Sequence, residues 1–166
     1  MSQGEIVNKV AQSPLITFNL EDYLPSRKED LDLSTFLEGG FILREKAFRE
    51  AIAGLDFPSL TGAVVRIFCS TDAILPAWAP LLVASRLIDY GITSYWANSD
   101  EAFWSAFYQK ALAKVDWNKF EGRPVIIKGC GDRRIPQDAY LCATQNLKPL
   151  AKKISYGEAC SAVPLK

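Results

Sequence analysis

Apolar residues follow two different spacings along this chain. In some stretches they recur every three or four residues, which is typical of helices, and in others they form short β-branched runs typical of buried strands. The helices predicted in this way cover 44–55, 76–90, 101–115 and 136–151. The predicted strands cover 63–68, 92–96, 124–128 and 153–157. Because helices and strands alternate, we expect an α/β fold with a mainly parallel or mixed sheet flanked by helices.

The chain also resembles itself at a spacing of about 60 residues. The matching residues occur in the same order and include Gly62 with Gly122, Val65 with Val125, Asp72 with Asp132, Pro76 with Pro136, and Leu87 with Leu147. We predict an internal duplication, with 44–100 as the first repeat and 101–160 as the second. Two α/β units that obey the same folding rules would also look alike, which is the alternative interpretation.

Residues 1–43 stand outside the predicted repeats and are interpreted as an N-terminal extension. Apolar and polar residues alternate over 16–20, which predicts a half-buried strand. Residues 25–30 are polar and predict a loop. The sequence contains no long linker, and a chain of 166 residues is long enough to bury one core. We therefore expect a single α/β domain over 1–166.

The composition excludes several classes of function. The 19 basic and 19 acidic residues balance, whereas nucleic-acid binding and polybasic membrane binding need excess positive charge. The chain contains no histidine, so a Ser-His-Asp triad, a Cys-His pair and a histidine metal ligand are all excluded. The N-terminus has no signal-peptide pattern, and no apolar stretch is long enough to span a bilayer. We expect a cytoplasmic protein with neither nucleic acid nor membrane as a partner.

Three of the four cysteines directly follow predicted strands. Cys69 follows the strand at 63–68, and Cys130 and Cys160 follow the strands of the second repeat. Since the carboxyl ends of parallel strands share one edge of a sheet, these thiols are expected to lie close together. Thiolates bind zinc or an iron–sulfur cluster. The predicted metal ligands are Cys69, Cys130 and Cys160, with Asp72, Asp132 and Glu158 as additional candidates.

Each of these residues also has a structural interpretation. A free cysteine packs as a small hydrophobic residue, and this is the interpretation we favour for Cys142, which lies inside a predicted helix. Asp72 and Asp132 are suited to act as paired carboxylates, but they are better explained as acceptors for backbone N–H groups of their own loops.

Several segments together resemble an uncharacterised bacterial family, domain of unknown function 2480. The segments that carry the resemblance are 5–8, 43–46, 69–78, 128–132, 135–136, 156–161 and 163–164. The resemblance covers nearly the whole chain and implies no established activity. Members are often encoded near iron–sulfur assembly factors, so the resemblance implies proteins of iron–sulfur assembly as partners.

Three functions follow, and we rank them in this order. The first is a metal- or iron–sulfur-binding accessory protein that uses Cys69, Cys130 and Cys160. The second is a non-catalytic interaction module in which the cysteines pack and aromatic residues supply anchors. The third is a thiol-dependent sulfur-transfer enzyme, whose base would have to be a carboxylate, a lysine or water. The sequence leaves open whether the metal is zinc or iron and whether the chain forms a homo-oligomer.

Overall fold

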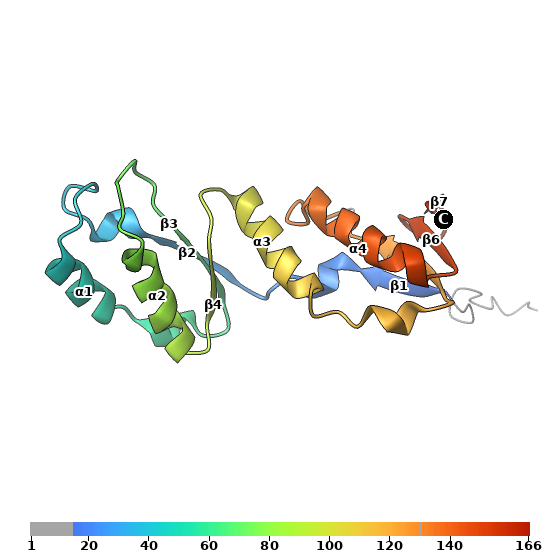
Figure 1. Cartoon of the computed structure of the whole chain (residues 1–166), viewed down its shortest axis with the longest axis horizontal. Helices are drawn as coiled ribbons and strands as arrows, with labels where there is room; N and C mark the ends of the chain where they lie inside the picture. Colours follow the sequence, from blue (N-terminus) through green and yellow to red (C-terminus); the bar gives the residue numbers. More distant parts are fainter. Residues whose placement is uncertain (1–14, 130) are drawn as a thin grey trace, which may run out of the picture. The chain divides into compact units, whose positions relative to one another are not determined.

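The computed structural model describes residues 15–129 and 131–166. The chain divides into two compact units, and the single domain expected over 1–166 stays a prediction. Unit 1 comprises the residues up to Leu24 together with Tyr108–Lys166, and unit 2 comprises Pro25–Phe107. Each unit combines parallel strands with helices, as Figure 1 shows, so the predicted α/β fold class is confirmed.

Unit 2 is built on a parallel sheet with the strand order β2-β3-β4. Its strands are β2 (Lys28–Asp32), β3 (Val64–Phe68) and β4 (Thr93–Trp96). Its helices are α1 (Glu45–Ala53), α2 (Trp78–Asp89) and the 3-10 helices η2 (Leu33–Phe36) and η3 (Phe57–Leu60). The central strand, β3, pairs with a neighbour on each side, so its backbone is satisfied within the sheet.

The core of unit 2 lies between one face of this sheet and the two α-helices. Val65 and Ile67 alternate along β3 and point to the same face, where they join one buried cluster with residues of both helices. From α1 the cluster takes Phe48 and Ile52, and from α2 it takes Ala79, Val83 and Leu87. Both helices therefore cover this face of the sheet.

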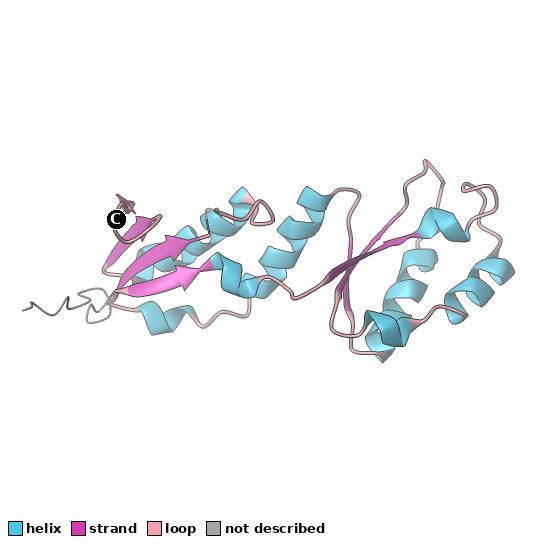
Figure 2. Ribbon diagram, turned by 180° about the vertical axis from the view of Figure 1, so that it is seen from behind, coloured by secondary structure: helices cyan, strands magenta, loops and turns pink. Residues whose placement is uncertain are grey.

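Unit 1 has the sheet order β1-β5-β6-β7, and Figure 2 shows this sheet with α4 behind it. Its strands are β1 (Ile16–Asn19), β5 (Pro124–Lys128), β6 (Lys153–Tyr156) and the short β7 (Val163–Pro164). Its helices are α4 (Gln137–Leu150) and the 3-10 helices η1 (Leu20–Tyr23) and η4 (Trp117–Phe120). Strands β1, β5 and β6 are parallel, and β7 runs antiparallel to β6. Helix α3 (Asp100–Leu112) begins in unit 2 and ends in unit 1.

The two units share one order of elements and one strand register. In unit 2, Val65 of the central strand pairs with Ser94, and in unit 1 Val125 pairs with Ile154, about 60 positions later in each case. The elements η3, β3 and β4 have the same lengths as η4, β5 and β6. The duplication itself stays a prediction, because two units built on the same rules would also share this order.

The N-terminal extension supplies one edge strand to each sheet. β1 pairs with β5 in unit 1, which confirms the strand predicted over 16–20. The loop predicted over 25–30 is wrong, because Lys28–Asp32 forms β2 and pairs with β3. Four of the five residues of β2 are charged, so this edge strand lacks the apolar alternation that identifies a half-buried strand.

The packing of α4 gives a direct test of these burial assignments. Leu147 is fully buried, whereas Leu141 on the same helix is half exposed. Replacing Leu147 by alanine should lower the free energy of unfolding by about 2–5 kcal/mol, because a cavity forms in the core. The control Leu141→Ala should change it by about 0.5 kcal/mol or less. Urea denaturation followed by circular dichroism measures both, and equal losses would contradict the assignment.

Candidate functional site

The 3-10 helix η2 and the loop after β3 meet at the carboxyl edge of the sheet in unit 2, and the carboxylate of Asp32 joins their backbones. The N–H groups of Ser34 and Ser70 both donate to Asp32 Oδ1 at 3.0 Å. The Ser34 and Ser70 hydroxyls are also 3.0 Å apart. Burial acts to raise the pKa of Asp32, but the hydrogen bonds from the two serines outweigh it and hold the pKa below its ordinary value. Asp32 is thus an ionised acceptor that ties the end of β2 to the loop after β3.

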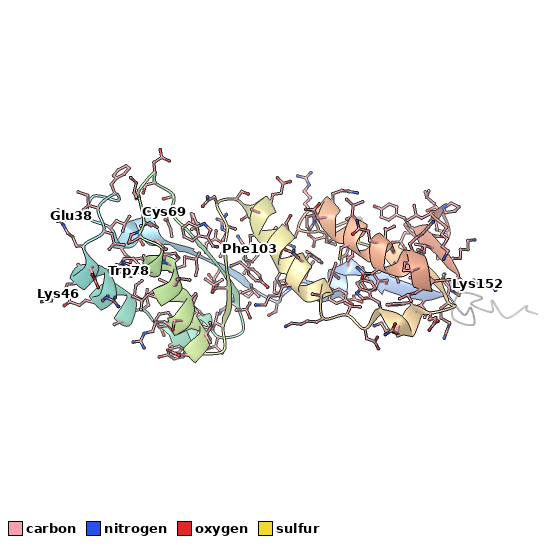
Figure 3. The ribbon with its side chains drawn as sticks, viewed as in Figure 1. Glu38, Lys46, Cys69, Trp78, Phe103 and Lys152 are labelled. Atoms are coloured by element: carbon pink, nitrogen blue, oxygen red, sulfur yellow. The ribbon has the colours of Figure 1, made fainter. Side chains whose placement is uncertain are left out.

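Cys69, the first predicted metal ligand, is tied into the same hydrogen-bonded edge. The Thr71 hydroxyl donates to the carbonyl oxygen of Gly40 at 2.5 Å, and the Cys69 thiol lies 3.4 Å from that hydroxyl. Because the hydroxyl has only one proton, the thiol must be the donor in the second contact. Cys69 is half-buried and packs against the core of unit 2. Figure 3 labels it at the end of β3. This environment suits a packed, structural cysteine.

Large apolar side chains project into solvent from the loop that contains Gly40 and from the loop after β3. Ile74 is 94 % exposed, and Phe41 is 58 % exposed beside the half-exposed Ile42. The Thr71–Gly40 hydrogen bond joins the loop of Phe41 to the loop of Ile74. In Figure 1 both loops lie at the upper edge of unit 2. We call residues 39–42 and 69–75 the loop edge of unit 2.

The sheet face opposite the core of unit 2 carries a network of ion pairs. Arg66 Nη2 lies 2.5 Å from Asp30, and Lys28 Nζ lies 2.8 Å from both Asp30 and Asp100. The Arg66 guanidinium also lies 4.3 Å from the centre of the Phe68 ring. Burial acts to raise the pKa of Asp30, but the hydrogen bonds from Arg66 and Lys28 lower it overall. The charges of Lys28 and Asp30 on β2 are therefore paired with α3 and β3.

In unit 1, the loop after β5 is shaped by close backbone packing. Gly129 has a φ of +132°, and a Cβ there would lie 2.9 Å from Ile135 and 3.2 Å from the Tyr140 hydroxyl, so only glycine fits. The Tyr140 hydroxyl donates to the carbonyl oxygen of Gly129. Asp132 accepts the backbone N–H of Arg134 at 2.9 Å, which confirms the structural interpretation of this aspartate. Hydrogen bonds from Arg134 hold the pKa of Asp132 below its ordinary value.

Cys160 lies in the segment that follows β6 in unit 1. Its side chain is exposed and lines a cavity of about 390 Å³ together with Ile126, Ser155 and Pro164. The neighbouring Glu158 forms an ion pair with Lys128 at 2.8 Å. Cys142, for which we favoured core packing, is half-buried in α4.

The structure distributes the predicted metal ligands over both units. Cys69 and the exposed Asp72 belong to unit 2, whereas Asp132, Glu158 and Cys160 belong to unit 1. Cys130 lies outside the described residues. Among the residues that are described, no three cysteine, aspartate or glutamate side chains form a group that could hold a metal ion. The site of Cys69, Cys130 and Cys160 therefore stays a prediction.

Sequence reasoning missed the loop edge of unit 2 as a surface. The sequence does contain an indication of this surface, because apolar residues stand beside a glycine or a polar residue in Gly40-Phe41-Ile42 and Asp72-Ala73-Ile74. Such short segments do not reveal whether their side chains are buried. Only the folded loops expose Phe41 and Ile74.

In the part of the chain that the structure describes, none of the helices combines the length and apolar character needed to cross a membrane.

Acid titration tests the ion-pair network. Because the pKa of Asp30 is lowered by folding, its contribution to stability is present above the unfolded value of about 3.9 and is lost as the pH falls through the lower folded value. Asp30→Asn should lower stability at neutral pH and reduce the loss of stability between about pH 4 and 2. Urea denaturation across this range measures the effect.

Glu38→Gln serves as the matched control, because Glu38 pairs with Arg44 where both side chains are mostly exposed. This variant should follow the wild-type profile. An Asp30→Asn profile that runs parallel to the wild type throughout the acid range would contradict the assignment.

Comparison with known proteins gives one match. Residues 4–166 match the family described as "Protein of unknown function (DUF2480)". No curated protein and no solved structure matches the chain.

Proposed function

Since the chain belongs to the DUF2480 family, whose function is unknown, we propose a function from the residues of this chain. It is a non-catalytic interaction protein that binds a partner through the loop edge of unit 2. The observation that carries this proposal is the exposure of Phe41, Ile42 and Ile74 on two loops joined by a hydrogen bond. Grouped apolar side chains in water are typical of protein-binding surfaces.

The position and rigidity of these loops support the same proposal. Ligands of parallel sheets usually bind at the carboxyl ends of the strands, where this edge lies. Asp32 holds the backbone of Ser70 and Thr71 holds the carbonyl oxygen of Gly40, so less conformational entropy is lost when a partner binds. The loops therefore present their apolar side chains in an ordered arrangement.

The chemistry of Cys69 favours binding over catalysis. Its thiol donates to Thr71 and packs against the core, whereas a nucleophilic cysteine needs a stabilised thiolate. The chain also contains no histidine that could act as its base. A thiol-dependent reaction at Cys69 would have to break the contact that connects it to the loop edge.

Site-specific photocrosslinking tests the proposal in the cells from which the protein comes. A benzophenone amino acid at position 41 should form a crosslink to a partner protein, and the same probe at Leu141 should not. Leu141 is the matched control, because it is also an exposed apolar residue but lies on α4 of unit 1. The resemblance implies proteins of iron–sulfur assembly as the first partners to examine.

Purified components then give the energetic test. The double variant Phe41→Ser/Ile74→Ser should weaken partner binding by about tenfold or more, since truncation of an apolar anchor costs about 1–2 kcal/mol or more. Thermal stability should change little, because both side chains are exposed. Equal crosslinking from positions 41 and 141, or unchanged affinity in the double variant, would overturn the proposal.

A metal- or iron–sulfur-binding role is the second candidate. The observation that favours it is the exposed thiol of Cys160, which follows β6, the parallel neighbour of β5. On this candidate, protein purified without air should contain zinc, or iron with sulfide absorption, and Cys69→Ser/Cys130→Ser/Cys160→Ser should lose it. Elemental analysis decides, since metal-free wild-type protein or a triple variant with full metal content would contradict the role.

A further inference from the structure

The outer edge of β6 in unit 1 is covered by a strand from the same chain. The antiparallel strand β7 pairs with it, and the N–H of Leu165 donates to the carbonyl oxygen of Ile154 at 2.8 Å. The N–H of Ile154 in turn donates to the carbonyl oxygen of Lys166. Lys148 of α4 reinforces this cover by donating from Nζ to the carbonyl oxygen of Leu165 at 3.3 Å. The edge of unit 1 is thus closed by backbone and side-chain hydrogen bonds.

Strand β4 holds the position in unit 2 that β6 holds in unit 1. The N–H of Ala97 donates to Ile67 at 3.1 Å, as the N–H of Gly157 donates to Ile127 at 3.0 Å. Since backbone groups alternate in direction along a strand, the N–H and C=O groups of Ser94 and Trp96 point away from β3. Among residues 15–129 and 131–166, no strand pairs with this outer edge.

The two edges of the sheet in unit 2 differ in their protection. β2, at one edge, carries charges at four of five positions, which discourages pairing with another chain. β4 reads Thr-Ser-Tyr-Trp and has no charge, proline or glycine, and Trp96 is 47 % exposed. Such a strand is an effective template for another strand.

The helix beside β4 extends this uncharged surface. Helix α2 packs against β4, and its polar residues Arg86 and Asp89 line a hollow shared with Arg49 of α1. At 100° per residue, Ala84 and Ile88 lie on the side of α2 away from that hollow, and Leu81 and Ile88 lie opposite the buried Val83. The side chains of Leu81 and Ile88 are 67 % and 69 % exposed.

Helix α4 of unit 1 carries a lysine at the position that Ile88 has in α2. Ile88 of α2 corresponds to Lys148 of α4 in the repeat of about 60 residues. Lys148 holds the chain that covers β6, whereas Ile88 is an exposed apolar side chain beside an edge without a strand. The surface of α2 at Ile88 is therefore suited to an apolar neighbour.

We propose that two copies of this protein associate by pairing β4 with β4 in an antiparallel manner, with Ile88 of α2 packed beside the new strand pair. A twofold axis makes identical strands antiparallel, which is the direction that β7 takes against β6. An uncharged strand brings no like charges together when it meets its own copy. The pairing joins two three-stranded sheets into one continuous sheet.

Sedimentation velocity of the full chain over a range of concentrations tests this dimer. Ile88→Lys places the residue of unit 1 at this position of α2, and Ser94→Pro removes an outward N–H that is not part of the β3–β4 ladder. Each variant should raise the dissociation constant by about tenfold or more, because the interface is buried and centred on these positions. Circular dichroism confirms that each variant remains folded.

The matched control is Leu141→Lys, which changes an exposed leucine of α4 and should leave the dimer intact. Hydrogen exchange gives a second readout, since the amides of Ser94 and Trp96 should exchange more slowly in the dimer than in Ile88→Lys. A wild-type chain that sediments as a monomer at every concentration would overturn the proposal. A dimer that both variants leave unchanged would do the same.

Discussion

The structure depends on the burial of one central strand in each unit. β3 and β5 have parallel neighbours on both sides, so their backbone groups are satisfied, and their apolar side chains must then be covered by helices. In unit 2, Val65 and Ile67 of β3 join residues of α1 and α2 in one cluster. The crossover helices take their places because they cover the core-facing side of that strand.

Burial of the central strand sets the residues of the core, whereas the loops at the ends of the strands can carry residues of another kind. At the carboxyl edge of unit 2, Asp32 and Thr71 hold the loops with hydrogen bonds. The loops thereby keep an ordered backbone while Phe41 and Ile74 remain in water. The loop after β3 also packs Cys69, Ala73 and Leu75 against the core, so the exposed side chains of this edge stand on a backbone that the core helps to hold.

The two units show how one architecture supports different surfaces. In unit 1, β7 and Lys148 close the outer edge of β6, whereas in unit 2 the equivalent strand is the uncharged β4 and Ile88 stands at the position of Lys148. The core positions scarcely differ, since Leu87 and Leu147 are both fully buried. Change is tolerated at the edges because those residues are not needed to bury the central strands.

The sequence alone determined the α/β class, the main helices and the central strands, because residues such as Val65 and Ile67 must be buried and their spacing shows it. It did not reveal β2, whose charges are satisfied only when Lys28 and Asp30 meet Arg66 and Asp100. Nor did it reveal that Cys69 and Cys160 belong to different units, or that Phe41 and Ile74 share one edge. Local spacing encodes which side chains avoid water, but contacts between distant segments arise only when the chain folds, and those contacts decided the candidate site.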